Sequence, residues 1–361
     1  VPEILPDPDD QPGNHKKPVK VYFLSGQSNM VGMGRQNTLR PLVEEDEKFG
    51  YLVDDEGNWT VRKDVHYINY VMDNRKNNDP LTVYRRFGPE VGIGHVLGTY
   101  HDETVLLLKG SCGNRSLGWD FCPPSAVKRQ GREQEVADAK AAGKWYAGKS
   151  YDRYVGHAKA VLENLENNLP GYQGQGFEFA GIFWWQGHKD KGMAREEYLQ
   201  LLGELIEDFR KDFNAPNAPF VVATVGFNGH NLGAWQGVWE AQMAISKQET
   251  FKGNVASVDI RDIGGGGISL RQQRRDVCEG RRPNGPGDGG TARSGRRESG
   301  GDERRARTRR DTDAGRARSR SGIGATAVGS GHAVQTSIRS DAASTRIGRK
   351  DQRAAGQCRR G

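Results

Sequence analysis

Five short runs of apolar, β-branched and aromatic residues recur along the first part of the chain. They occupy residues 20–24, 104–108, 180–185, 220–224 and 255–260, and each of the first four leads into a turn that contains glycine. Runs of this length that do not alternate with polar residues are typical of strands buried on both faces. The pattern therefore predicts five buried strands of one sheet.

Helical patterns fill the segments between these runs. Residues 89–100, 151–165, 195–213 and 232–246 repeat apolar positions at helical spacing. Because strand and helix alternate over residues 18–263, we predict one α/β domain with three layers, α/β/α, around a parallel sheet. The carboxyl ends of its strands would form one ligand-binding edge.

Two long loops follow the first two predicted strands, at residues 32–87 and 110–149. They are rich in Trp, Tyr, Asn, Asp and Arg. Loops longer than about 15 residues inside a compact domain are usually functional. We therefore expect both loops to contribute to a site at the strand ends.

The composition changes abruptly at Gly264. Every Trp, Tyr and Phe precedes it, and residues 264–361 consist mainly of Arg, Gly, Ser, Ala, Asp and Thr. A segment of this composition cannot bury enough apolar surface to form a core, so we expect a disordered tail. Residues 1–17, rich in Pro and Asp, are expected to be a spacer at the start of a secreted or periplasmic protein.

The net charge of +7 is unevenly distributed along the chain. Roughly +13 lies in residues 264–361, which leaves about −6 for the rest. The core is then mildly acidic, and we expect it to bind no nucleic acid. A basic tail that binds nucleic acid or an acidic surface remains one interpretation of residues 264–361.

The four cysteines, Cys112, Cys122, Cys278 and Cys358, form no CxxC pair and no zinc-ligand spacing. We expect neither a metal nor another cofactor. Cys112 and Cys122 lie in one loop and either form a disulfide or stay as two thiols. No apolar run reaches the length of about 18 residues that a membrane span needs, and nothing indicates an oligomeric state.

Ser28 follows the first predicted strand in the turn Gly26-Gln27-Ser28-Asn29-Met30. A hydroxyl at this edge of a parallel sheet, with backbone N–H groups around it, suits a nucleophile for acyl transfer. The alternative is that Ser28 and Asn29 serve only as helix N-caps.

Two further strand ends carry groups for the same chemistry. The segment 110–118 follows the second run, and its glycine Gly113 lets a backbone N–H approach a developing oxyanion. The segment 186–190 follows the third run and begins with Gln186, whose side-chain amide offers a second donor.

These three blocks resemble a known family. Residues 26–30 (GQSNM), 112–117 (CGNRSL) and 185–190 (WQGHKD) are similar to the nucleophile, oxyanion-glycine and third blocks of SGNH-type hydrolases, above all the sialate O-acetylesterase-like and acetyl xylan esterase branch. The resemblance covers about residues 18–263. It implies a flavodoxin-like fold with a five-stranded parallel sheet, and a serine esterase that removes O-acetyl groups from a sugar or polysaccharide.

The resemblance also implies roles for single residues. Ser28 would be the nucleophile, and the N–H groups of Ser28 and Gly113 and the amide of Gln186 would be oxyanion donors. His188 stands where many relatives have a glutamate, and we expect it to contact substrate or support the structure. The candidates for contact with the sugar are Asn114, Arg115, Trp185 and His188.

Trp119, Trp184 and Trp185 are candidates for a platform under a sugar ring. Successive strand residues face opposite ways, so one of Trp184 and Trp185 is equally well explained as a core residue under a helix. Arg115 and Asp120 are loop charges that would contact substrate hydroxyls or have no such role.

The family's general base is a histidine after the fifth strand, often in Asp-x-x-His, and this chain has none there. Its fifth run leads into Asp259-Ile260-Arg261-Asp262-Ile263 and then four glycines. With permitted codons, residues 267–280 read one base later give Tyr-His-Tyr-Asp-Asn-Asn-Ala-Glu-Thr-Tyr-Val-Lys, which resembles the family's histidine block and the start of its last helix. We therefore hypothesise a frameshift near residues 264–267, natural or from sequencing.

If the frame is shifted, the chain as written lacks its base, and we expect feeble activity. His332 lies inside the tail and is a poor substitute. An alternative from another class is a non-catalytic carbohydrate-binding protein that keeps the aromatic loops on a decayed esterase fold.

Overall fold

The computed structural model of the protein describes residues 4–226 and 228–262. The predicted disordered tail, the hypothesised frameshift and His332 lie outside these residues, as do Cys278 and Cys358. The strands are β1 (Val19–Gly26), β2 (Gly34–Arg35), β3 (Arg62–Val71), β4 (Asn74–Leu81), β5 (Arg86–Phe87), β6 (Val105–Ser111), β7 (Phe177–Trp185), β8 (Phe220–Ala223) and β9 (Val255–Val258).

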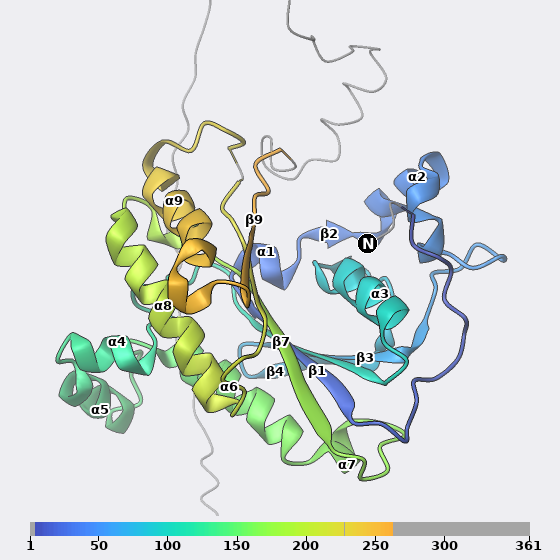
Figure 1. The fold of residues 1–361 in the computed structure, drawn as a ribbon, viewed down its shortest axis with the longest axis horizontal. Helices are drawn as coiled ribbons and strands as arrows, with labels where there is room; N and C mark the ends of the chain where they lie inside the picture. Colours follow the sequence, from blue (N-terminus) through green and yellow to red (C-terminus); the bar gives the residue numbers. More distant parts are fainter. Residues whose placement is uncertain (1–3, 227, 263–361) are drawn as a thin grey trace, which may run out of the picture. The chain divides into compact units, whose positions relative to one another are not determined.

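A seven-stranded sheet in the order β4-β3-β6-β1-β7-β8-β9 forms the centre of the fold (Figure 1). All neighbouring strands in it are parallel except β3 and β4, which form an antiparallel pair. The five predicted strands are β1, β6, β7, β8 and β9, and numbered along the chain they stand in the order 2-1-3-4-5. This is the flavodoxin-like order, as predicted.

The predicted number of five strands was too low, because β3 and β4 lie inside the segment that was predicted to be a loop. The reason is their polarity. Strand β3 begins with Arg62, which is buried through an ion pair with Asp64, and β4 is a mostly exposed edge with the sequence NRKNNDPL. Neither strand shows the uninterrupted apolar run that marks the other five.

The four predicted helices are confirmed as α3 (Glu90–Tyr100), α6 (Lys149–Leu162), α8 (Arg195–Asp212) and α9 (Gln236–Ala244). Both predicted long loops contain short helices of their own. The remaining helices are α1 (Ser28–Val31), α2 (Gln36–Glu45), α4 (Pro124–Arg129), α5 (Glu133–Ala141), α7 (Leu165–Asn168) and the 3-10 turns η1 (Glu47–Leu52), η2 (His188–Asp190), η3 (Gly233–Trp235), η4 (Ile245–Lys247) and η5 (Glu249–Phe251). Within the described ranges, no helix is long and apolar enough to cross a membrane.

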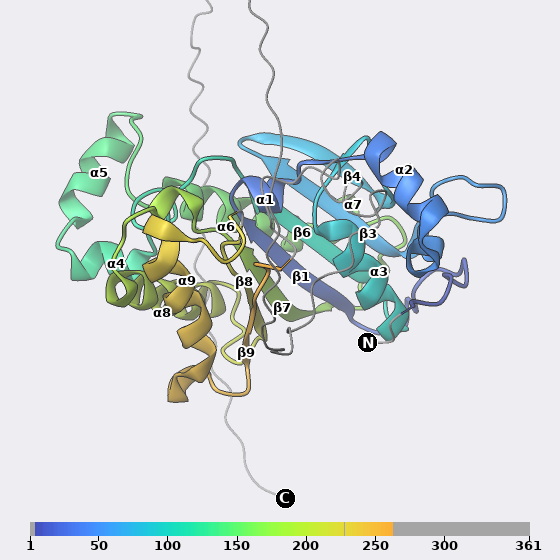
Figure 2. The same ribbon diagram turned by 90° about the horizontal axis from the view of Figure 1, so that it is seen from above.

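One face of the sheet is covered by three of the longer helices. Helices α6, α8 and α9 pack on it, as Figures 1 and 2 show. Alternate strand residues point into this layer and form the main core, among them Phe23, Leu108, Trp184 and Val222. The largest of them, Trp184, is only 1% exposed.

On the other face, the described residues cover only half of the width of the sheet. Helix α3 packs on β3 and β6 and buries a smaller core around Leu24, Tyr67 and Leu107. Over β7, β8 and β9 the described residues place only the short α1, at the end of β7. The strand residues that stay partly or largely exposed there are Phe183, Trp185, Val221, Ala223, Ala256 and Val258.

Candidate active site

The register of the parallel strands sets the predicted blocks side by side. Gly26, the last residue of β1, pairs with Ser111 at the end of β6 on one side and with Trp185 at the end of β7 on the other. Ser28 and Gly113 each follow two residues after these strand ends. In a sheet of order 2-1-3-4-5, ligands bind at the strand ends where β1 and β7 meet, because the connections diverge there.

The turn after β1 presents Ser28 at this edge. Gly26 has φ +148°, and a Cβ there would collide with the carbonyl oxygen of Trp185, so the turn requires glycine. The N–H of Gln27 donates to the same carbonyl at 3.0 Å. The half-buried Ser28 opens α1, and none of the described residues forms a hydrogen bond with its hydroxyl.

The N-cap alternative for Ser28 is not realised. The residue that precedes α1 is Gln27, and no side chain caps the helix. The Ser28 hydroxyl is therefore not used to satisfy a helix end.

The loop after β6 presents a second N–H group. Gly113 is exposed, its N–H has no partner among the described residues, and a Cβ built on it would meet nothing within 4 Å. The preceding N–H, of Cys112, donates to the carbonyl oxygen of Gly26 at 3.3 Å and ties the loop to the nucleophile turn. Asn114 follows with φ +56° and an exposed side chain. An open space thus borders the Gly113 N–H.

Gln27 joins the first block to the third. Its side chain is 3% exposed, and Oε1 accepts the N–H of Gly187 at 3.4 Å, the N–H of Lys189 at 3.3 Å and the Gln186 amide at 3.2 Å. These bonds hold the turn after β7 against the nucleophile turn.

The side-chain amide of Gln186 also makes several hydrogen bonds. Besides Gln27, its Nε2 donates to the carbonyl oxygen of Arg115 at 2.8 Å and to Asp190 Oδ2 at 2.5 Å, and its Oε1 accepts the Tyr198 hydroxyl at 2.8 Å. In this arrangement the amide links the three blocks to one another. Its role as an oxyanion donor stays a prediction.

Asp190 completes the link to the oxyanion loop. Its carboxylate accepts the N–H of Leu117 at 2.9 Å and the N–H of Gly118 at 3.0 Å. Burial raises the pKa of Asp190, while these N–H donors and Gln186 oppose the rise. Neither Gln27 nor Asp190 was singled out from the sequence, although both lie inside the quoted blocks and both are buried polar residues that need partners.

Arg115 lies beside the Gly113 loop with its guanidinium stacked on Trp145, 4.2 Å from the ring centroid. Its contact with Asp120 is long, 3.4 Å from Nη1 to Oδ1. Asp120 is instead bound by the Trp145 indole N–H at 3.0 Å and by the N–H of Ser116 at 2.9 Å. Asp120 therefore shapes the loop to which Arg115 belongs.

The structure separates the two adjacent tryptophans. Trp184 packs edge-on against Phe121 and Phe209 in the core, so its proposed place in a sugar platform is wrong. Trp185 faces the half-covered side, is partly exposed and donates its indole N–H to the carbonyl of Thr224 at 3.2 Å.

Two other predicted contacts lie on the surface. The exposed His188 stacks on Trp235 with ring centroids 5.3 Å apart, and Trp235 donates its indole N–H to the His188 carbonyl at 2.9 Å. Trp119 is half-buried under the guanidinium of Arg132, 4.1 Å from its ring.

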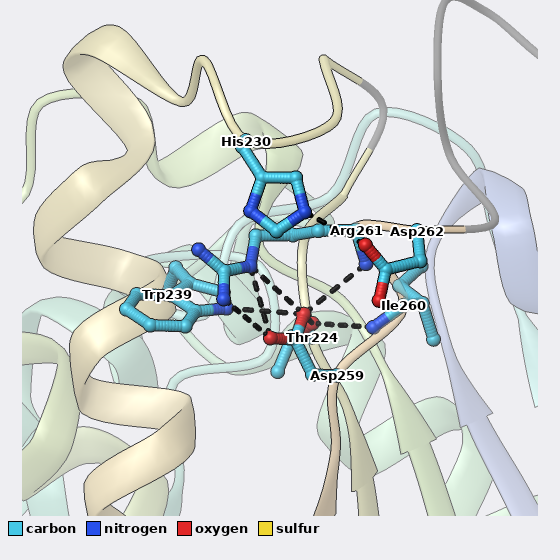
Figure 3. A network of polar contacts seen from close by, with 7 residues as sticks. All are labelled: Thr224, His230, Trp239, Asp259, Ile260, Arg261 and Asp262. Atoms are coloured by element: carbon cyan, nitrogen blue, oxygen red, sulfur yellow. Dashed lines mark hydrogen bonds and ion pairs between the residues drawn. The ribbon is translucent and has the colours of Figure 1, made fainter. Parts of the chain in front are cut away.

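The end of β9, where the family's base is expected, is shown in Figure 3. Asp259 accepts the Trp239 indole N–H at 3.3 Å and the Arg261 guanidinium, which lies 3.8 Å over the Trp239 ring. His230 Nε2 lies 2.7 Å from Asp262 Oδ1, with both side chains largely exposed. No histidine in the described ranges is hydrogen-bonded to Ser28.

The described cysteines form no disulfide, and the described residues form no metal site. Cys112 and Cys122 are buried free thiols, so the disulfide alternative is not realised. Burial raises the pKa of Cys122 to about 11. Over residues 4–226 and 228–262, no group of three or more His, Cys, Asp or Glu side chains is arranged to hold a metal ion.

Known proteins similar to this chain include two solved structures and the members of one family. A solved structure from Arabidopsis thaliana is 17% identical, with 71% of this chain and 94% of that chain covered and a TM-score of 0.41. A carbohydrate acetylesterase from Xanthomonas citri is 12% identical, with 72% and 54% covered and a TM-score of 0.41. No curated protein matches the chain. The family described as carbohydrate esterase, sialic acid-specific acetylesterase matches residues 18–264, and the chain belongs to this family.

Proposed function

We propose that the protein is a serine esterase that removes O-acetyl groups from a carbohydrate, with Ser28 as the nucleophile. One observation carries the proposal. The register of β1, β6 and β7 brings the Ser28 hydroxyl, which none of the described residues engages, to the same edge as the unpartnered N–H of Gly113. A nucleophile beside an open oxyanion donor is the arrangement that acyl transfer needs.

The reaction follows from these groups. Ser28 Oγ attacks the acetyl carbonyl and loses its proton to a general base, and the N–H groups of Ser28 and Gly113 stabilise the oxyanion. The sugar hydroxyl leaves with a proton, and water then hydrolyses the acetyl-enzyme to acetate. Gln186 joins the oxyanion donors if its amide turns from Arg115 or Asp190 toward the carbonyl oxygen.

The sugar would lie over the exposed edge formed by the second and third blocks. Asn114 and Arg115 border the Gly113 loop, Trp185 ends β7, and His188 lies in the turn after it. Polar side chains that contact hydroxyl groups, together with an aromatic face, are the usual components of a small-molecule site. We propose contacts between these four residues and the sugar.

The general base is proposed to come from the shifted reading frame. Described histidines make no hydrogen bond with Ser28, and the alternative frame would place a histidine a few residues after β9. The half-covered face supports this proposal, since the described residues leave β7, β8 and β9 without the cover that a parallel sheet normally has on both faces. The chain as written is then weakly active.

Labelling with a fluorophosphonate probe tests the nucleophile. Peptide mass spectrometry of the labelled protein should place the adduct on Ser28, and Ser28→Ala should abolish it. Ser246→Ala, a change in η4 where the hydroxyl contacts Ser257 of β9, serves as the matched control and should label like the wild type. Labelling elsewhere, or labelling that survives Ser28→Ala, would remove the proposal.

The substrate class is tested separately by acetate release. O-acetylated sialic acid and acetylated xylan are offered in parallel to wild type and Ser28→Ala, because the two sugars differ in charge and in ring substitution. Ser28-dependent release from either identifies the preferred class. Release from neither by a frame-repaired chain whose Ser28 reacts with the probe would exclude both.

A second candidate is a carbohydrate-binding protein on the same fold, favoured by the missing contact between Ser28 and a described histidine. It predicts binding of the same sugars, measured by calorimetry, that is unchanged in Ser28→Ala. It also predicts no labelling even after the reading frame is repaired.

A further inference from the structure

A buried ion pair lies behind the nucleophile turn. Lys109 Nζ on β6 is 2.7 Å from Glu90 Oε2 at the start of α3, and the two side chains are 0% and 2% exposed. Burial lowers the pKa of Lys109, which the Glu90 carboxylate counteracts. Buried ion pairs often add little stability compared with apolar residues of similar volume. Stability alone is therefore a poor explanation for this pair.

The ammonium group also contacts the helix that Ser28 begins. Lys109 Nζ donates to the carbonyl oxygen of Val31 at 3.1 Å and lies 5.3 Å from the centre of the Tyr67 ring. Val31 is the last residue of α1, and the N–H of the next residue, Gly32, donates to the Ser28 carbonyl at 3.1 Å. A single helical turn thus separates the ammonium group from the nucleophile.

Lys109 is carried by the strand that leads to the oxyanion loop. It lies four residues before Gly113 and pairs with Leu24 of β1 in the sheet. The same side chain therefore connects the backbone that presents Ser28 with the strand that presents the Gly113 N–H.

Glu90 holds a third segment against the turn. Its Oε1 accepts the N–H of Gly88 at 2.9 Å. Gly88 packs so closely on the end of α1 that a Cβ there would lie 2.8 Å from the Gly32 Cα. The carboxylate thus fixes both the ammonium group and the segment that lies against α1.

We propose that Lys109 and Glu90 are positioning residues, which keep the Ser28 turn and the Gly113 loop in the mutual geometry that the reaction needs. They act through the backbone of α1 and β6 and touch no substrate. The inference rests on the proposed function only in treating Ser28 and Gly113 as the reacting and oxyanion-binding groups.

Charge-neutral replacement of the whole pair separates positioning from stability. Lys109→Met alone leaves the Glu90 carboxylate buried without its partner. Glu90→Gln alone leaves the Lys109 ammonium group buried without its partner. The double variant, Lys109→Met with Glu90→Gln, leaves no unpaired charge and keeps an oxygen for the Gly88 N–H, but it loses the bond to Val31. Lys159→Met, which removes a partly exposed lysine paired with Asp212, is the matched control.

Melting temperature and the rate of fluorophosphonate labelling are measured for each variant in the full 361-residue chain. Lys109→Met should melt several degrees lower, by roughly 5–10 °C, and the double variant should recover most of this loss. Labelling of Ser28 should stay about 10- to 100-fold slower in both, because displacement of a reacting group by about 1 Å is enough for such a loss. Lys159→Met should label like the wild type.

A double variant that melts and labels like the wild type would overturn the inference, since the pair would then be structural only. Hydrogen exchange over residues 28–34 gives a readout that needs no esterase activity. Faster exchange there in the stable double variant supports positioning, and unchanged exchange contradicts it. A frame-repaired chain that carries no label on Ser28 refutes the proposed function instead, and hydrogen exchange in the double variant then remains the test of the pair.

Discussion

The two faces of the central sheet differ in how far they are covered, and two adjacent residues show the consequence. Trp184 points toward α6, α8 and α9 and is 1% exposed, whereas Trp185 points the other way and stays partly exposed. Both residues are tryptophans, and both lie on β7. What lies above each one decides whether it belongs to the core or to the surface.

The contrast within the second face is equally informative. Helix α3 covers β3 and β6, whereas Val258 on β9 is 46% exposed. The half that the described residues leave uncovered includes β9, the strand after which the family's histidine block is expected. The proposed frameshift explains both features together, because one altered reading frame would remove the base and the helix that follows it.

Repair of the reading frame is expected to have the largest effect. Deleting one base within the codons for residues 264–267 should restore a histidine after β9 and raise kcat/KM for p-nitrophenyl acetate by about 10²- to 10⁴-fold, the contribution of a general base. The same repair in Ser28→Ala should give no gain. An uninterrupted original frame in the resequenced gene, or a repaired chain that is no faster, would contradict the proposal.

Replacing the two tryptophans separately should reproduce the difference between the faces. Trp184→Ala leaves a large cavity in the covered layer and should lower the free energy of unfolding by about 3–5 kcal/mol. Trp185→Ala in the chain as written should cost about 1 kcal/mol, since its ring is already partly in water. Urea unfolding followed by circular dichroism measures both, and equal losses would show that the second face is covered after all.

The buried His95 on α3 tests the layer between α3 and η1, where its ring packs on Tyr51 with the centroids 4.9 Å apart. Burial lowers the pKa of His95 on α3 to about 3, with a smaller contribution from Arg62. Since an unfolded histidine has a pKa near 6.5, the unfolded chain binds a proton that the native chain does not between roughly pH 6.5 and 3. The free energy of unfolding should therefore be highest above pH 6.5 and fall on the order of 3 kcal/mol by pH 4.

His95→Leu should remove most of this pH dependence, while the pH dependence that other titratable groups give to the free energy of unfolding should remain. The measurement is urea unfolding at a series of pH values for the two proteins. If the free energy of unfolding falls equally in wild type and His95→Leu on acidification, the His95 ring is not buried away from water.

The smallest expected effect is at the uncovered edge. Val258→Lys should change the free energy of unfolding by no more than about 0.5 kcal/mol in the chain as written, as for other exposed positions. In the frame-repaired chain the same change should cost about 1.5 kcal/mol, because a covering helix would bury the valine. Equal costs in the two chains would argue that nothing further packs on β9.

Local patterns were sufficient for the strands with uninterrupted apolar runs, for the helices with regular apolar spacing and for the three glycine-containing turns. In these segments the residues themselves carry the preference, and the parallel order then brings Ser28 and Gly113 to one edge. The hairpin of β3 and β4 escaped prediction because Arg62 is buried only through Asp64 and α3, and because β4 is a polar edge.

Other features depended on partners far away in the chain, which a local pattern does not contain. Gln27 and Asp190 became structural links only when β1 and β7 placed the three blocks together, and Lys109 became part of the Ser28 turn only when α3 supplied Glu90. The fates of Trp184 and Trp185 likewise followed from the helices above each face. A buried polar or aromatic side chain takes its role from whatever neighbour satisfies or covers it, and the fold alone supplies that neighbour.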